Sequence, residues 1–477
     1  MKKISKYIGG LSLLILVIMI MKTITFSSNQ VQHETINPIQ VSSSAISRLQ
    51  GAIKYKTISY QFPGKPDSIE FMGLHNYFEK MFPLIHSLTE KTTFKYSLLY
   101  KWQGKNDNVK PVLLMSHIDV VPVDQATLSD WEAGPFSGEL KNGNIYGRGT
   151  MDNKMGVLGI MEAVEMLMED GFKPERTIYL AFGHDEEIGG DKGAGSIAAF
   201  LEEEGVDLEF VIDEGGFIVN GLIPGLDKPM AVINVAEKGY VTYELSITTS
   251  GGHSSNPPED NTIGSLAKAI VKLENSQFPY KSIPVLEEQI ASLGPELSFS
   301  SKFFFANSWL FKSYILKDLN AHTTTAPTII SGGIKDNVIP TRATATVNFR
   351  VMTGETTDQV KNHIIETIKD DRITVEAVRN INEPSKVSDY TSNAYMIIQK
   401  TIKQLYPNIV VSPGLISGGT DTKHYANISE NAYRFVPISI NEKNKTGFHG
   451  INEHISSKNY IKIVQFYYQF IQNLNIK

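Results

Sequence analysis

Four groups of acidic residues and histidines follow apolar runs along the sequence. The first is His117 with Asp119, after the run VLLM. In an extended chain these two side chains point to the same side, so Asp119 can orient the imidazole of a metal-binding His117. A lone histidine at a strand end is more often structural, but the carboxylate two residues on favours a ligand.

Three consecutive acids make the third group the most informative. Asp185, Glu186 and Glu187 follow the run TIYLAF and precede a Gly-Gly pair. Adjacent acids at the mouth of a buried strand repel one another unless cations neutralise them. Successive side chains project differently, so Glu187 can bind a metal while Glu186 faces the water that the metal activates. A solvated acidic loop is the alternative, although such a loop usually lacks the preceding buried strand.

The second and fourth groups supply further carboxylates. Asp152 ends the Gly-rich string GRGTMD just before a helical pattern, where an aspartate is usually a helix N-cap but can also bridge two metals. Asp213 and Glu214 follow the run LEFVI, and the residues alone leave open which of them is a ligand.

Charge balance favours two divalent ions over one. The chain has no cysteine, so His, Asp and Glu must supply every ligand. Asp152, Glu187 and Asp213 would bring three negative charges against four positive ones, and a hydroxide completes neutrality. His117 and His449 fill the remaining positions without adding charge. That hydroxide is a nucleophile available near neutral pH.

The elements that position these groups alternate between strands and helices. Apolar runs at 111–115, 177–182 and 208–212 suit buried strands, and 154–170 has helical spacing that stops at Gly171. This order predicts an α/β fold, a mostly parallel sheet with helices on both faces. Ligands bind beyond the carboxyl ends of strands in such sheets, where the acids lie.

The pattern changes near residue 238. Strand patterns at 239–249 and 343–351 alternate with helices at 261–273 and 358–370, which predicts an inserted α+β domain over 238–381. The catalytic domain would comprise 46–237 and 382–477. Within the insert, 279–327 is rich in aromatics. An extra helical pair packing its own aromatics is favoured there over a hydrophobic substrate wall or a membrane-facing patch.

The amino terminus predicts export. Lysines precede an uncharged stretch from Tyr7 to Met21, which is intermediate between a signal peptide and a spanning helix. We favour a retained signal-anchor over 1–26, with cleavage after Ser27 as the alternative and a polar linker over 27–45. Either route places the rest of the chain outside the cytosol. A net charge of −6 with scattered basic residues gives no reason to expect nucleic acid.

Eight strings, in order, resemble the metallopeptidase family of carboxypeptidase S, aminoacylase, carboxypeptidase G, acetylornithine deacetylase and succinyl-diaminopimelate desuccinylase. They span roughly residues 50–470 and are most similar to the carboxypeptidase S branch. The strings are LLMSHIDVVPV, GRGTMDNK, AFGHDEEIGG, VIDEGG, SGGHSSNPP, GGIKDNVIP, SGGTDTKHY and FHGINE.

The resemblance implies a two-zinc site, with cobalt or manganese as possible substitutes, and a role for each matched residue. It implies Glu186 as general base and Asp119 as the residue that orients His117. The branch favours Asp213 over Glu214 as ligand. The implied metal ligands are His117, Asp152 (bridging), Glu187, Asp213 and His449.

The resemblance also places substrate-binding groups on the smaller domain. His253 would stabilise the tetrahedral intermediate, often from a dimer partner, and Asn337 and Arg350 would hold the substrate carboxylate or oxyanion. Gly418, Gly419 and Thr420 match a loop of backbone donors. His454 departs from the family, which commonly has a basic residue there, without affecting the assigned site. The inserted domain is expected to serve as a lid and dimerisation domain.

The expected activity is cleavage of an amide bond to release a free amino acid. A carboxypeptidase S-like peptidase and an N-acyl-amino-acid hydrolase both fit, and no single residue separates them. A non-catalytic metal-binding protein fits less well, because the base and every ligand position are kept.

Overall fold

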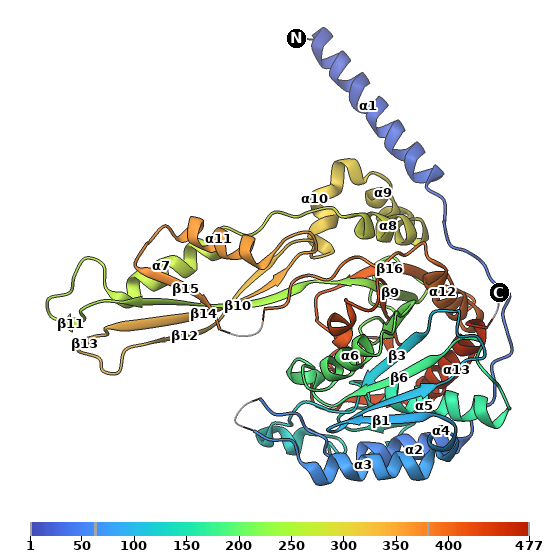
Figure 1. The fold of residues 1–477 in the computed structure, drawn as a ribbon. Coiled ribbons are helices and arrows are strands. Elements are labelled where there is room, and N and C mark those ends of the chain that lie inside the picture. The colour runs from blue at the N-terminus through green and yellow to red at the C-terminus, as the bar shows by residue number, and fades with distance from the viewer. Residues whose placement is uncertain (1, 62–63, 379–380, 476–477) are drawn as a thin grey trace.

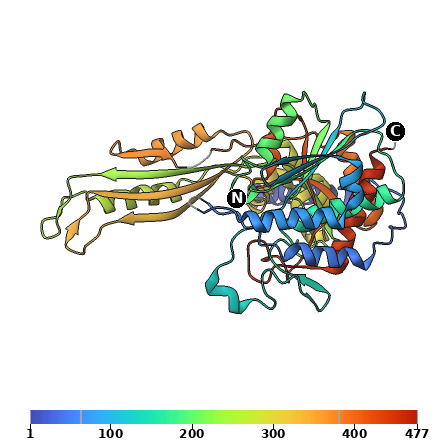
Figure 2. The ribbon, with the colours of Figure 1, turned by 60° about the horizontal axis from the view of Figure 1, so that its bottom comes forward.

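The computed structural model describes residues 2–61, 64–378 and 381–475. Residues 1 and 476–477, at the outer ends of the predicted terminal segments, and 379–380, near the predicted end of the insert, lie outside the described residues. A rounded body carries a long arm to one side and a single helix that projects from its top (Figure 1). Turning the molecule shows that the arm is thin and joins the body at one edge (Figure 2).

The body is built on a large sheet with the order β1-β2-β6-β3-β7-β17-β9-β8-β18, and β16 pairs with β9. The central pairs β3–β6, β3–β7 and β7–β17 are parallel, whereas β1 and β2 form an antiparallel edge. This confirms the predicted mostly parallel α/β sheet. Its strands are β1 (Glu90–Phe94), β2 (Ser97–Trp102), β3 (Val112–His117), β6 (Ile178–Gly183), β7 (Phe210–Asp213), β8 (Ile218–Val219), β9 (Met230–Glu237), β16 (Val410–Ile416), β17 (Ala432–Arg434) and β18 (Ser439–Ile440).

Helices cover both faces of this sheet, as predicted. Alternate residues of the central strands point to opposite faces: Leu114 packs under one helical layer, and Leu113 and Met115 pack under another. The second layer is α6 (Ala194–Glu203). The first layer comprises α2 (Ser43–Ile53), α3 (Ser68–Met81), α4 (Pro83–Leu88), α5 (Lys154–Glu169), α12 (Asn393–Leu405) and α13 (Ser457–Asn473).

The arm has its own sheet, with the order β12-β14-β10-β15, and its own core. Every residue of β14 that faces α7 and α11 is buried, and the alternate residues are more exposed, as expected for a sheet with one open face. All these elements fall inside the predicted insert, although its exact boundaries stay a prediction. They are β10 (Gly239–Thr248), β11 (Gly252–His253), α7 (Thr262–Asn275), β12 (Thr324–Gly332), β13 (Val338–Ile339), β14 (Arg342–Val351), α11 (Thr357–Ile368) and β15 (Ile373–Ala377).

Between α7 and β12 lie three further helices, α8 (Pro284–Leu293), α9 (Phe299–Ala306) and α10 (Ser308–Asp318). They sit on the body beside β16, at the base of the projecting helix α1 (Lys2–Thr25) (Figure 1). The aromatic stretch therefore does form helices, and Phe303, Phe304 and Phe311 contact one another.

The predicted linker has no regular secondary structure from residue 26 to residue 42, but it is fastened to the body. The side chain of Gln30 accepts hydrogen bonds from Val411 N (2.8 Å) and Lys403 Nζ (2.9 Å). Ile36 and Ile39 pack against the main core. The segment is thus bound along the body rather than standing free as a stalk.

Candidate metal centre

The last residue of β3, His117, lies at the carboxyl edge of the sheet and is 1% exposed. Its Nδ1 faces the Asp119 carboxylate at 3.3 Å and the Asp119 carbonyl at 3.0 Å, so Nδ1 carries the proton and Nε2 is left to bind a cation. The same carboxylate accepts the backbone N–H groups of Glu186 and Glu187, each at 3.2 Å. Asp119 therefore positions both the histidine and the acidic loop.

The carboxylate of Asp152 lies between two histidines. Its Oδ1 is 3.1 Å from Nε2 of His117, and its Oδ2 is 3.0 Å from Nε2 of His449. The N-cap of α5 is Asn153, which makes no side-chain capping bond, so capping does not account for Asp152. One oxygen directed at each imidazole is the placement that a bridging ligand needs.

Glu186 and Glu187 begin a short 3-10 helix, η2 (Glu186–Ile188), which is separated from β6 by two residues. Glu187 Oε2 lies 3.1 Å from Nε2 of His449, and Glu187 Oε1 is buried without a hydrogen-bond partner. Glu186 Oε2 lies farther back, 4.0 Å from Nε2 of His117. Glu186 is grouped with His117 and Glu214, and Glu187 with His117 and Asp152, as side chains close enough to hold a metal ion together. The assignment of Glu187 as ligand and Glu186 as base stays a prediction.

Proximity separates Asp213 from Glu214. Glu214 Oε1 lies 3.0 Å from Nε2 of His117. Among the described residues, the group of ligand-type atoms that contains Glu214 consists of His117, Glu186 and Glu214, and Asp213 is in neither such group. Asp213 is the buried last residue of β7, and its carbonyl accepts the N–H of Phe435 at 2.7 Å.

The electrostatics of the cluster fit a cation. Burial raises the pKa of Glu214 to about 8 and that of Asp213 to about 6, and it raises the pKa of Glu186 well above its usual value. Burial opposes protonation of His117, yet the neighbouring carboxylates of Glu214, Asp119 and Asp152 hold its pKa well above the ordinary value. Buried acids in excess, a carboxylate oxygen with no partner and two imidazoles are the donor set that zinc prefers.

Glu453 supports the cluster from behind. It is fully buried and its Oε1 accepts the backbone N–H groups of Gly149 (2.9 Å), Met151 (2.8 Å) and Asp152 (3.2 Å). Its Oε2 pairs with Arg148 at 2.8 Å, and Arg148 also donates to the carbonyl of His449 at 3.3 Å. This pair, which the sequence analysis did not single out, ties the loop of Asp152 to the loop of His449. Its signal was present in the strings GRGTMD and FHGINE.

Replacing Glu453 with glutamine should weaken metal binding by roughly 10–100-fold, as is usual when a group that orients ligands is lost. The amide cannot hold three backbone N–H groups and Arg148 together. The measurement is the metal dissociation constant from competition with a chelator. Glu442→Gln, on an exposed turn, is the matched control. Unchanged affinity in a folded Glu453→Gln variant would show that the pair does not position the ligands.

The arm residues assigned to substrate binding fall into two places. Arg350 lies near the body: its guanidinium stacks over Tyr240 at 4.7 Å and donates to the carbonyl of Ser417 at 3.3 Å, next to Gly418 and Gly419. His253 and Asn337 lie at the strands β11 and β13, at the far tip of the arm from the metal cluster (Figure 1). The structure thus brings Arg350 and the glycine loop to the body, and it does not bring His253 and Asn337 to this chain's own cluster.

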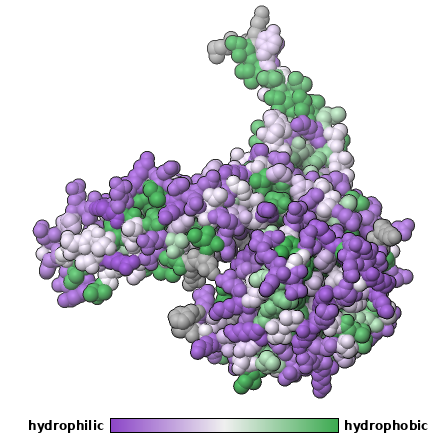
Figure 3. Space-filling model, in the orientation of Figure 1, coloured by the Kyte–Doolittle hydropathy of each residue, from purple (hydrophilic) through white to green (hydrophobic). Residues whose placement is uncertain are grey.

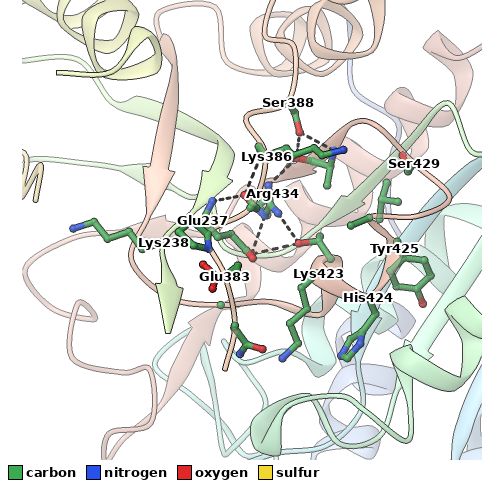
Figure 4. A pocket seen from close by; sticks show the side chains of 18 of the residues that line it. Glu237, Lys238, Glu383, Lys386, Ser388, Lys423, His424, Tyr425, Ser429 and Arg434 are labelled. Carbon is green, nitrogen blue, oxygen red and sulfur yellow. Dashed lines mark hydrogen bonds and ion pairs between the residues drawn. The ribbon is translucent and has the colours of Figure 1, made fainter. Parts of the chain in front are cut away.

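A buried ion pair links the loop of Thr420 to the start of the arm. Glu237, at the end of β9, pairs with Arg434 at 2.8 Å and accepts the hydroxyl of Thr420 at 2.6 Å. Both charged residues line a cavity of about 760 Å³ that also contains Lys423 and Gly419 (Figure 4). The residues grouped as possible metal ligands do not line this cavity, so it is separate from the candidate metal centre.

Buried acids that converge on two imidazoles, with a further glutamate among them, are the arrangement of a metal-dependent hydrolase. Comparison with known proteins agrees. The model of the family described as Peptidase family M20/M25/M40 matches residues 113–473. The chain belongs to this family, and it is therefore a metallopeptidase or amidohydrolase.

The relatives extend over nearly the whole chain. A probable carboxypeptidase S-like 2 from Dictyostelium discoideum is 40% identical and aligns over 96% of this chain and 92% of its own length. The N-fatty-acyl-amino acid synthase/hydrolase PM20D1 of Mus musculus is 39% identical, over 89% of this chain and 86% of its own. Among solved structures, an M20 family metallo-carboxypeptidase from Sulfolobus solfataricus shares the fold with a TM-score of 0.70 and 20% identity, covering 91% of this chain and all of the other.

Proposed function

We propose that this protein is a two-zinc hydrolase that cleaves an amide bond and releases a free amino acid. The observation that carries the proposal is Asp152, because its two oxygens lie 3.1 and 3.0 Å from the imidazoles of His117 and His449. His117, Asp152 and Glu214 would hold one ion, and Asp152, Glu187 and His449 the other. Glu214 is preferred to Asp213, the family-based expectation, because its carboxylate is the one beside His117.

Two zinc ions, when bound, supply Lewis acidity that makes water a nucleophile near neutral pH and polarises the scissile carbonyl. Glu186 accepts the proton of the attacking water and returns it to the leaving amine. Its raised pKa, caused first by burial, suits a group that must both take and give a proton. Cobalt or manganese would fit the same oxygen and nitrogen donors, and elemental analysis of the purified enzyme would identify the metal.

Substrate recognition would come from the arm. Arg350 would bind the carboxylate of the released amino acid through paired hydrogen bonds, with backbone N–H groups of Gly418 and Gly419 close by. His253 would stabilise the tetrahedral intermediate. Because His253 and Asn337 lie at the tip of the arm, the proposal has a second copy's arm supply them, in a homodimer formed through the inserted domain.

The acyl side of the substrate distinguishes two activities. A peptidase of the carboxypeptidase S type is our first choice, and hydrolysis of N-acyl amino acids is the second, supported by the similarity to the mouse enzyme. Dipeptides, N-acetyl amino acids and N-fatty-acyl amino acids should be offered to the metal-loaded protein in one screen. Failure to cleave any of these classes, at full metal content, would contradict the proposed hydrolase.

We also propose that the catalytic domain is exported and stays attached to a membrane through α1. Lys6–Thr25 is long and apolar enough to span a bilayer. Among the described residues, one helix meets this condition, and it is α1. Cleavage after Ser27 would remove Thr23 and Phe26. Thr23 is fully buried, and the ring of Phe26 lies where Gly294 leaves no room for a Cβ atom. These contacts favour a retained anchor over a cleaved signal.

A further inference from the structure

The surface formed by α9 and α10 is unusually apolar. None of the residues of α9 is buried, although its sequence contains Phe303, Phe304 and Phe305 in a row. Large apolar side chains are also exposed on α10 and at the first residue of α9. The most exposed of this surface are Phe299, Phe304, Trp309, Leu310 and Tyr314. A surface of this kind marks contact with a partner or a lipid surface.

The helix α1 is seated directly on this pair. Asn307, between α9 and α10, donates to the carbonyl of Met19 at 3.2 Å and to Thr23 Oγ1 at 3.3 Å. Lys22 lies over the ring of Trp309 at 5.7 Å. Asn307 and Thr23 are fully buried in this contact. The space-filling view shows α1 as a hydrophobic column that rises from a largely hydrophilic body (Figure 3).

These contacts set the depth of the pair relative to a bilayer. A helix rises about 1.5 Å per residue, so Lys6–Thr25 is about 30 Å long, close to the thickness of the hydrocarbon core. Met19 then lies about 9 Å inside the end of the span at Thr25. Helices that lie in a membrane interface bury their apolar face about 5–10 Å deep. If α1 crosses the bilayer while packed on α9 and α10, the pair must lie in that layer.

The side chains match the chemistry of the layer. Trp309 and Tyr314 are amphipathic aromatics of the kind that gather at the boundary between acyl chains and headgroups. Lys302, Lys312 and Lys317 carry the basic charge of the pair, against the single acid Asp318. Their long stems can lie along apolar surface while the ammonium groups reach lipid phosphates.

We propose that α9 and α10 form a membrane platform that lies in the interfacial layer of the outer leaflet crossed by α1. The occupant of the apolar surface is thus phospholipid, and the platform fixes the orientation of the catalytic body above the bilayer. The proposal rests on the retained anchor proposed above, and it is independent of the catalytic assignment.

Tryptophan fluorescence tests the platform in the full-length protein reconstituted into phosphatidylcholine–phosphatidylglycerol vesicles. The chain has three tryptophans, and Trp102 and Trp131 are buried in the body, so Trp309 reports on the platform. Lipid brominated near the headgroup should quench roughly half of the Trp309 emission, and lipid brominated near the chain ends should quench it less. The Trp309 signal is obtained by subtracting the emission of Trp309→Phe.

A tryptophan in another helix provides the matched control. Met72 on α3 is exposed on the opposite side of the body from α1, so Met72→Trp in the Trp309→Phe background should be unaffected by either lipid.

Resistance of the protein to alkaline extraction reports separately on α1. Extraction-resistant protein whose Trp309 is unquenched would overturn the platform while the anchor stands, as would quenching mainly by bromine near the chain ends. If Trp309 is shielded from water but is not quenched by brominated lipid, the surface would instead be covered by a second protein copy. Extractable protein would remove the anchor and the platform together.

Discussion

Glu186→Gln is expected to reduce turnover by roughly 10²–10⁴-fold while leaving both metal positions filled. The amide keeps the shape of the side chain but cannot accept the proton of the attacking water. Glu186 Oε2 stands 4.0 Å from His117 Nε2, whereas Glu214, Asp152 and Glu187 each have an oxygen within 3.1 Å of a histidine nitrogen. The loss should therefore appear in kcat, with metal content measured on the same sample.

Glu187→Gln is the matched comparison, because it changes the adjacent residue in the same way. Here the metal content itself should fall, since Glu187 faces His449 at 3.1 Å and keeps a buried oxygen without a partner. If Glu186→Gln retained substantial activity, or if it lost metal as Glu187→Gln should, Glu186 would not be the base.

Asp152→Asn should produce the largest change in metal content. The substitution leaves one oxygen and places an NH₂ group against one of the two imidazoles, so neither ion keeps its shared ligand. We expect at least one of the two equivalents to be lost at metal concentrations that saturate the unchanged protein, with turnover abolished. Elemental analysis after gel filtration measures the stoichiometry.

Asp124→Asn is a suitable control for Asp152→Asn. Asp124 caps an exposed 3-10 helix and accepts the N–H of Ala126 at 2.9 Å, and it is in neither group of possible metal ligands. Circular dichroism of both variants in the presence of a chelator would separate loss of metal from loss of fold. Two tightly bound equivalents in Asp152→Asn would refute the bridging role.

The prediction of the fold succeeded because its signals are local. Apolar runs that end in acids predicted β3, β6 and β7 to within about two residues, and the helical spacing of 154–170 predicted α5. The alternation at 343–351 matched β14, one face of which is buried. Since a strand's carboxyl end is read from one stretch of sequence, the edge at which His117 and Glu187 meet followed as well.

Local sequence patterns could not predict the direction in which a side chain at the end of a strand points. Asp213 and Glu214 are adjacent, and the choice between them depends on which one turns toward His117 after β7 ends. The exposure of α9 also differs from the favoured prediction, which was a helical pair packing its own aromatics. Both outcomes depend on what packs against a residue from elsewhere in the chain.

By itself the sequence determined which residue types could serve as ligands, the α/β body with helices on both faces of its sheet, and the inserted arm, because each depends on residue type and short-range periodicity. The tertiary structure alone decided which atoms meet. It brought His449 to Asp152 across nearly 300 residues and placed Glu453 behind both loops. It also seated α1 on α9 and α10. The physical reason is that these contacts are set by the packing of whole elements, and no local pattern records which distant side chain will fill a given space.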